Sequence, residues 1–294
     1  MKSALTAITI SLTLLGGLSR VEAVQVTLYD GAAGGLPASQ GWLNYADTTV
    51  IFPTPPFFLP GGGNQSAIAG GTNLNSLGSS GSDNNIYAGY SNRFTNVSLS
   101  PLSVTPGDFV NPSFPTLDRN AGYTLTFTVQ IASQVNDGAD GANRAGFNVT
   151  ALSSDKRGIE IGFRTNDIFA QSDNPIFTQA EINNSVGSLL AAATTYNLNI
   201  SGNSYSLTAG GNSILSGPLR DYSLSPNPVN PYTTPNFILL GDNSTEARAS
   251  INLFSVSLTA NTSAAAVPFN FNPTFGLLIL GAWTVFSQLR TKQK

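Results

Sequence analysis

Apolar and polar residues alternate along the second half of the chain as they do in half-buried β-strands. In the segment 123–131, Tyr123, Leu125 and Phe127 are separated by single threonines. Side chains of a strand point to opposite faces with a period of two, so this segment is predicted to have one buried and one exposed face. The same alternation is found over 145–151, 159–163, 196–200, 205–207 and 251–258, and the apolar run 237–240 is a further predicted strand.

Turn-forming residues separate these predicted strands. Asparagine, aspartate and glycine are concentrated at 136–138, 155–158, 202–203 and 210–212, and they adopt the backbone conformations that tight hairpins require. Many short strands joined in this way indicate an all-β fold. We therefore expect an antiparallel β-sandwich or barrel.

Residues 31–117 have a different amino-acid composition. Only Asp47, Asp83, Arg93 and Asp108 are charged there, and proline, glycine and serine are clustered at 53–56, 61–63 and 78–81. Such composition favours loops, although short apolar pieces at 26–29, 41–43 and 86–87 are predicted to add strands to the sheet. We therefore expect one domain over residues 24–260, with a loop-rich part, 24–117, and a part with regular strands, 118–260.

The N-terminal segment 1–23 has the layout of a signal peptide. Lys2 precedes an apolar run over 4–18, and Val21, Glu22 and Ala23 form a small-residue exit of the kind that signal peptidase recognises. The alternative is an N-terminal membrane helix. The run is shorter than the roughly 20 residues that a bilayer core demands, which favours the signal peptide.

The C-terminal end combines a proline-containing motif, an apolar segment and a basic tail. A linker over 261–267 leads into this segment, 268–294. The motif is Val267, Pro268, Phe269, Asn270 and Phe271, the apolar segment includes Phe275, Leu277, Leu278, Ile279, Leu280, Trp283 and Phe286, and the tail carries Arg290, Lys292 and Lys294. A hydrophobic helix closed by cations is typical of a minimal membrane span whose basic end stays inside. A plain single-pass anchor and a buried core helix are the alternatives.

This layout resembles the C-terminal sorting signal of the PEP-CTERM family. The resemblance implies that a membrane enzyme, exosortase, recognises the signal, cleaves near the motif and releases the protein or transfers it to the cell surface. The usual motif is Val-Pro-Glu-Pro. Residues 268–271 are closer to the Pro-Phe-Glu-Phe variant typical of cyanobacterial members, with Asn270 in place of the glutamate.

A second resemblance covers most of residues 24–260. It is carried by Leu-Tyr-Asp-Gly at 28–31, Gln-Gly-Trp at 40–42, and the stretches 144–149, 154–163, 219–222 and 235–242. These resemble the choice-of-anchor Y domain of surface proteins. The pattern at 205–215 is also similar to concanavalin-like jelly rolls. The resemblance implies a concanavalin-like antiparallel β-sandwich, and it implies no activity.

Composition narrows the chemistry. The chain has no cysteine and no histidine, which excludes disulfides, the usual zinc sites and histidine-dependent triads. Fifteen acidic and eight basic side chains between residues 24 and 267 give this part a net charge of −7. An acidic domain with so few cations is not expected to bind nucleic acid.

Glycoside hydrolases of the laminarinase or lichenase type share the jelly-roll fold and place carboxylates on one strand as Glu-x-Asp-x-x-Glu, so that they converge on the sugar. Here Glu160 occupies the first position, but Gly162 and Thr165 occupy the other two. Glu160 is therefore interpreted as a polar residue of the outer face, paired with Arg164 or Lys156.

A glycine-rich turn offers a candidate calcium site. Asn136, Asp137, Asp140 and Asn143 place oxygen ligands at short intervals, which suits Ca²⁺. The same residues are common in an ordinary tight hairpin, so a plain turn is the alternative. Apart from this ion, we expect no cofactor.

Together these patterns predict an exported, non-catalytic protein of the cell surface or extracellular matrix with a structural or adhesive role. Its expected partners are the membrane, through the C-terminal helix, an exosortase and surface polysaccharide. The alternative function is a lectin-like carbohydrate-binding module, in which Trp42, Tyr90, Tyr222 or Tyr232 stacks on sugar rings instead of packing in the core. A glycoside hydrolase is the less favoured reading.

Overall fold

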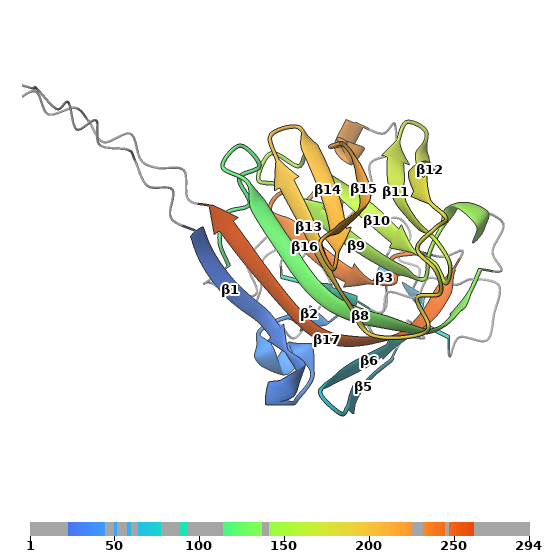
Figure 1. Cartoon of the computed structure of the whole chain (residues 1–294). Coiled ribbons are helices and arrows are strands. Elements are labelled where there is room, and N and C mark those ends of the chain that lie inside the picture. Colours follow the sequence, from blue (N-terminus) through green and yellow to red (C-terminus); the bar gives the residue numbers. More distant parts are fainter. Residues whose placement is uncertain are drawn as a thin grey trace, which may run out of the picture. The chain divides into compact units, whose positions relative to one another are not determined.

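Two antiparallel β-sheets pack face to face in the computed structural model of the protein (Figure 1). The structure describes residues 23–44, 50–51, 58–59, 64–77, 89–92, 114–136, 141–224, 232–244 and 247–261. All of these residues belong to one compact unit. The predicted all-β antiparallel sandwich is confirmed.

The first sheet, sheet A, has the strand order β15–β14–β13–β8–β17–β6–β5, and β1 also pairs with β17. Its strands are β1 (Ala23–Asp30), β5 (Asn64–Ile68), β6 (Gly71–Asn75), β8 (Tyr123–Val135), β13 (Thr194–Ser201), β14 (Ser204–Ala209), β15 (Asn212–Pro218) and β17 (Arg248–Asn261). Strand β17 pairs with β8 along one edge, and β6 and β1 share its other edge. Residues near the two ends of the described chain therefore lie side by side in one sheet.

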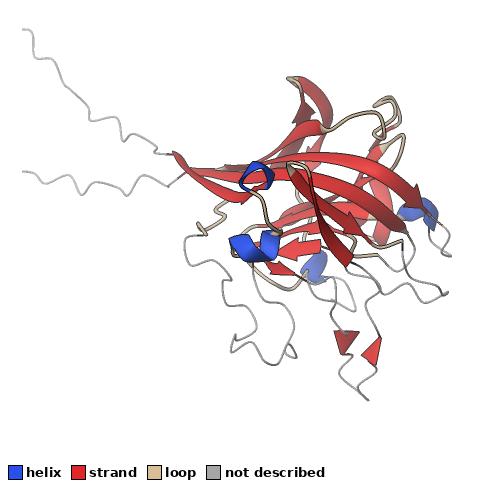
Figure 2. Cartoon of the chain, turned by 90° about the horizontal axis from the view of Figure 1, so that it is seen from below, coloured by secondary structure: helices blue, strands red, loops and turns tan. Residues whose placement is uncertain are grey.

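The second sheet, sheet B, has the order β12–β11–β10–β9–β16–β7–β2. Its strands are β2 (Leu43–Asn44), β7 (Gly89–Ser91), β9 (Phe147–Leu152), β10 (Gly158–Phe163), β11 (Ile168–Asp173), β12 (Ile176–Asn183) and β16 (Phe237–Gly241). A separate pair joins β3 (Val50–Ile51) to β4 (Phe58–Leu59). Figure 2 shows that strands dominate; the described helical residues form short 3-10 turns, η1 (Gly31–Ala33), η2 (Pro37–Gln40), η3 (Gly141–Asn143) and η4 (Tyr222–Leu224).

The alternating segments became strands with the expected buried face. In β8 every second residue from Tyr123 to Ile131 is buried and the threonines between them are partly exposed. The apolar piece 26–29 forms part of β1, as expected, and β1 begins at Ala23, one residue before the predicted start of the domain. Strands β11 and β12 were not predicted, because their sequence, 168–183, lacks a continuous period of two.

Aromatic rings from both sheets meet in the centre of the core. Phe127 of β8 and Tyr196 of β13 stack with their centroids 5.5 Å apart. Phe163 of β10 contacts both rings at centroid distances of 5.7 and 5.1 Å, and Phe147 of β9 lies 5.3 Å from Phe163. This cluster joins sheet A to sheet B.

Sheet B is buried on both faces in its middle. All residues of β9, β10 and β16 are buried, and on the outer face Tyr222 and Tyr232, with the described residues beside each of them, contribute to this cover. There these tyrosines form a second apolar cluster with Leu152, Phe237 and Leu239. The alternation in the sequences of β9 and β10 therefore does not correspond to one buried and one exposed face.

Candidate functional site

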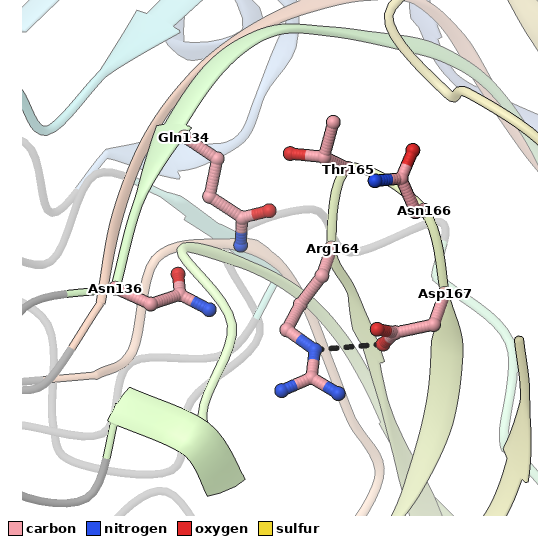
Figure 3. Close-up of a pocket in the computed structure, with 6 residues that line it drawn as sticks. All are labelled: Gln134, Asn136, Arg164, Thr165, Asn166 and Asp167. Carbon is pink, nitrogen blue, oxygen red and sulfur yellow. Dashed lines mark hydrogen bonds and ion pairs between the residues drawn. The ribbon is translucent and has the colours of Figure 1, made fainter.

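An open polar pocket lies where the end of β8 meets the turn between β10 and β11 (Figure 3). It has a volume of about 400 Å³, and all six lining residues are polar: Gln134, Asn136, Arg164, Thr165, Asn166 and Asp167. Figure 3 shows the side chains of Gln134 and Asn136 directed from β8 toward Arg164. Sheet A and sheet B therefore each contribute one wall.

A tight turn holds the charged pair of this pocket in place. The Arg164 backbone N–H donates to the Asp167 carbonyl oxygen at 2.9 Å, and Arg164 Nε donates to Asp167 Oδ1 at 2.7 Å. Arg164 Nη1 also donates to the Ala142 carbonyl oxygen at 2.6 Å, and the guanidinium lies over the Phe169 ring, 5.1 Å from its centroid. The two side chains are only 17% and 18% exposed, so the ion pair is rigid and partly desolvated.

Other lining groups are available to a ligand. Within the part of the chain that the structure describes, the Thr165 hydroxyl and the Asn166 side-chain amide have no hydrogen-bond partner. Gln134 Nε2 makes one long bond of 3.3 Å to the Phe163 carbonyl oxygen, which leaves its own oxygen as an acceptor. Amides and hydroxyls of this kind match the hydroxyl groups of a sugar.

Glu160 lies in a buried polar cluster, and the expected pairing with Arg164 or Lys156 is wrong. Its Oε2 accepts hydrogen bonds from Thr150 Oγ1 at 3.0 Å, Tyr232 Oη at 2.7 Å and Asn243 Nδ2 at 2.8 Å. Its Oε1 has no hydrogen bond within the described residues and lies 3.6 Å from Arg144 Nη1. Glu160 is on the outer face of sheet B as expected, but the residues that cover this face leave it 0% exposed.

Arg144 and Gln171 complete this cluster. Arg144 Nη1 donates to Gln171 Oε1 at 2.8 Å, and the guanidinium lies over the Phe177 ring at 4.6 Å from its centroid. Gln171 is held in turn by a 3.0 Å bond from its Nε2 to the Thr178 carbonyl oxygen. With both charged members buried, the cluster balances one anion against one cation in a medium of low polarity.

Three aromatic residues that were candidates for sugar stacking are buried. Trp42 is 5% exposed, Tyr222 0% and Tyr232 2%, so they pack in the interior; the side chain of Tyr90 lies outside the described residues. Burial raises the pKa of Tyr222 and Tyr232 well above the usual value, and the nearby Glu160 carboxylate raises both further. Both phenols therefore remain protonated and act as hydrogen-bond donors.

A second buried carboxylate follows β16. Asp242 is 2% exposed; its Oδ1 accepts from the Ser244 backbone N–H at 2.9 Å, and its Oδ2 has no hydrogen-bond partner among the described residues. Burial raises the pKa of Asp242 well above the usual value, although Arg144 and Arg248 act in the opposite direction. No signal in the linear sequence distinguishes Asp242 from exposed aspartates.

The candidate calcium residues are only partly described. Asp137 and Asp140 lie outside the described residues, Asn136 lines the polar pocket, and Asn143 ends η3. In the described segments there is no group of three or more acidic side chains that could hold a metal ion.

Steric crowding at Gly162 also disfavours the carboxylate pattern Glu-x-Asp-x-x-Glu of laminarinase-type and lichenase-type hydrolases. A Cβ atom on Gly162 would come within 2.4 Å of Phe169 Cζ, so no carboxylate fits at that position while this ring covers it. Thr165, at the third position, lines the polar pocket instead. Sequence reasoning missed the pocket, whose only local signal is the polar run 164–167 between two apolar strands.

The predicted signal peptide, 1–23, lies outside the described residues except for Ala23, the first residue of β1. The predicted sorting motif, apolar segment and basic tail, 267–294, also lie outside them. Among the residues that are described, no helix has the length and apolar character needed to cross a bilayer.

Similarity to known proteins was found in structure and not in sequence. No protein-family model matches the sequence, and no curated protein matches it. Among the solved structures that are similar in fold are the following three. A carbohydrate esterase from Shiga toxin-encoding bacteriophage phi24B is 11% identical with a TM-score of 0.45, covering 81% of this chain and 100% of that one. A Bacillus licheniformis beta-glucanase is 11% identical with a TM-score of 0.41, covering 81% and 98%. Alginate lyase A1-II', of polysaccharide lyase family 7, is 11% identical with a TM-score of 0.40, covering 81% and 95%.

These neighbours correct two expectations. The protein was expected to be non-catalytic, with a structural or adhesive role, whereas the three solved structures named above are carbohydrate-active enzymes. The expectation that it is not an enzyme is contradicted. At this identity the likeness is one of fold, and no substrate or residue role is transferred from it. The chain adopts an antiparallel β-sandwich.

Proposed function

We propose that this protein acts on a polysaccharide, which it takes in the open polar pocket between the end of β8 and the β10–β11 turn. The observation that supports the proposal best is the lining of this pocket: amides, one hydroxyl and one ion pair, with no apolar side chain among its six residues. Carbohydrate hydroxyls act both as donors and as acceptors, and this set of groups offers both.

The pocket carries one group that is able to take up a proton. Asp167 is the only carboxylate among the described residues that line it, and the partner of Asp167 Oδ1 is Arg164 Nε. Asp167 Oδ2 has no partner in the described chain and is available as a general base toward a sugar hydroxyl or a water molecule. Among the described lining residues, the role of general base therefore falls to Asp167, and none of the others is the second carboxylate that most glycoside hydrolases use.

Substitutions at the ion pair test both binding and turnover. Wild-type protein is assayed against a panel that contains a neutral β-glucan, chitin and alginate, and binding, new reducing ends and unsaturated products are recorded. Asp167→Asn preserves shape, and we expect it to lower turnover about 100-fold or more while binding persists. Arg164→Ala removes the support of Asp167 and a lining donor, so both binding and turnover should fall.

The matched control is Asp155→Asn. It removes another ion pair, that of Arg119 with the 45% exposed Asp155, away from the pocket, and should change neither readout. Unaltered turnover in Asp167→Asn and unaltered binding in Arg164→Ala would rule the pocket out as the site. Absence of binding to every glycan of the panel would overturn the proposal as a whole.

We also propose that the chain is exported and first held in the membrane by the apolar segment 275–286. The support is the sequence layout at both ends. Deleting residues 269–294 should release the domain into the medium, and Leu278→Asp with Ile279→Asp should do the same, because each charge costs about 2.5–3.5 kcal/mol near the centre of a span. Mass spectrometry of the surface form then reports whether the tail has been removed.

A further inference from the structure

The outer face of sheet A carries a regular array of uncharged polar side chains. Strands β13, β8 and β17 lie side by side there (Figure 1). Two rungs cross them in register, Asn197–Thr126–Ser257 and Thr195–Thr128–Ser255. We call these six residues the hydroxyl lattice. All six are at least partly exposed, and none of them is charged.

Strand geometry sets the spacing of the lattice. Neighbouring strands lie about 4.8 Å apart, and residues on the same face of one strand repeat about every 6.7 Å. Thr208 of β14 and Thr27 of β1 continue the first rung on either side. That rung therefore offers five hydroxyl or amide groups across five strands, without a lysine, arginine, aspartate or glutamate.

Hydrogen bonds between the side chains orient the lattice in advance. Thr126 Oγ1 donates to Asn197 Oδ1 at 2.8 Å, the hydroxyls of Thr128 and Thr195 are 2.8 Å apart, and Ser255 Oγ donates to Thr128 Oγ1 at 3.1 Å. These bonds restrict the rotamers, so little side-chain entropy is left to lose on binding. Asn197 Nδ2 has no partner in the described chain, and each hydroxyl oxygen retains acceptor capacity.

We propose that the hydroxyl lattice is a second carbohydrate-binding surface, separate from the polar pocket, and that it takes a neutral polysaccharide chain. A neutral chain presents hydroxyl groups as donors and acceptors, which the lattice can match group for group. A charged partner would lose part of its hydration shell on this face and would form no ion pair in return, because the lattice carries no charge. The net charge of −7 between residues 24 and 267 additionally disfavours an anionic chain.

The experiment measures binding of the full chain to a soluble neutral β-glucan and to alginate by affinity electrophoresis. Thr126→Val with Thr128→Val removes two hydroxyls and preserves the branched shape that suits a strand. We expect this double variant to bind the β-glucan about tenfold more weakly, since each hydrogen bond contributes modestly to the net affinity. Thr126→Asp places a charge in the lattice and should weaken binding further.

Two control variants are needed. One tests whether an added charge anywhere on the surface weakens binding, and the other separates binding by the lattice from binding by the pocket. Ala180→Asp puts the same charge at an exposed position on β12 of the other sheet and should leave β-glucan binding intact. Arg164→Ala alters the pocket and should leave a lattice-dependent component. Three results would each overturn the proposal: wild-type affinity in the double valine variant, equal affinity for alginate, or loss of all binding in Arg164→Ala.

Discussion

At the scale of single residues, the burial of charged side chains is the feature that the sequence pattern predicts least well. Glu160 occupies an ordinary alternating position in β10, yet it is fully buried; three donors bond its Oε2, and the Arg144 guanidinium lies 3.6 Å from its Oε1. The donors come from β9 and from residues more than 70 positions later in the chain. A carboxylate in such a setting is structural, since solvent has no direct access to it.

Removal of the Glu160 charge is expected to be costly. Glu160→Gln keeps the size of the side chain but leaves Arg144, 5% exposed, as an uncompensated buried cation. We expect the free energy of unfolding to fall by about 3–5 kcal/mol, measured by urea denaturation. Asp155→Asn breaks an exposed pair and should cost no more than about 1 kcal/mol. Equal losses in the two variants would contradict the role of burial.

Asp242 predicts a particular pH dependence. Its pKa is raised above 3.8 in the folded state, chiefly by burial, so the folded protein binds more protons than the unfolded chain as pH rises from about 4. The stabilising contribution of Asp242 is therefore present at low pH and is lost as pH rises through the folded-state pKa. Asp242→Asn cannot ionise, and its stability relative to wild type should increase over that window. A constant difference between the two urea midpoints would contradict this.

At the scale of elements, Tyr222 joins two strands where their ladder ends. The β10–β11 pairing runs from Phe163 with Ile168 to Ile161 with Ala170. One position further, the Tyr222 hydroxyl accepts from the Glu160 backbone N–H at 3.0 Å and donates to the Gln171 carbonyl oxygen at 2.9 Å. The phenol replaces a direct strand-to-strand hydrogen bond and ties η4 to the outer face of sheet B.

Tyr222→Phe should therefore destabilise the fold by at least about 2 kcal/mol, because it leaves a buried donor and a buried acceptor without partners. Tyr29→Phe is the matched control. The Tyr29 hydroxyl makes one long bond of 3.4 Å to the Gly35 carbonyl oxygen, and its loss should cost no more than about 1 kcal/mol. Thermal and urea unfolding of both variants provide the comparison, and a smaller effect at Tyr222 than at Tyr29 would refute it.

At the scale of the whole molecule, the aromatic cluster of Phe127, Tyr196, Phe147 and Phe163 joins the two sheets. Phe163 is 1% exposed and contacts the other three rings. Phe163→Ala is expected to lower the free energy of unfolding by about 3–5 kcal/mol. Leu224→Ala, at a side chain that is 77% exposed, should change it by less than about 0.5 kcal/mol. A loss at Phe163 no larger than that at Leu224 would show that the sheets do not depend on this cluster.

The sequence by itself determined the fold class and most strands with one exposed face. Alternation in β8, β13 and β17 is a local property, because one buried face is enough to impose a period of two. Strands β11 and β12 were not predicted: the first four residues of β11 are all buried, and β12 is a partly exposed edge strand with an irregular register, so neither keeps a continuous alternation.

Only the tertiary structure decided which polar residues meet. Arg144, Glu160 and Asn243 lie far apart in the chain, and the strand order of sheet B brings them together. The polar pocket likewise needs the end of β8 in one sheet beside the β10–β11 turn of the other. Periodicity predicts which face of a strand a residue occupies, whereas strand order and the residues that cover the sheet determine whether that face meets solvent, a partner charge or a tyrosine.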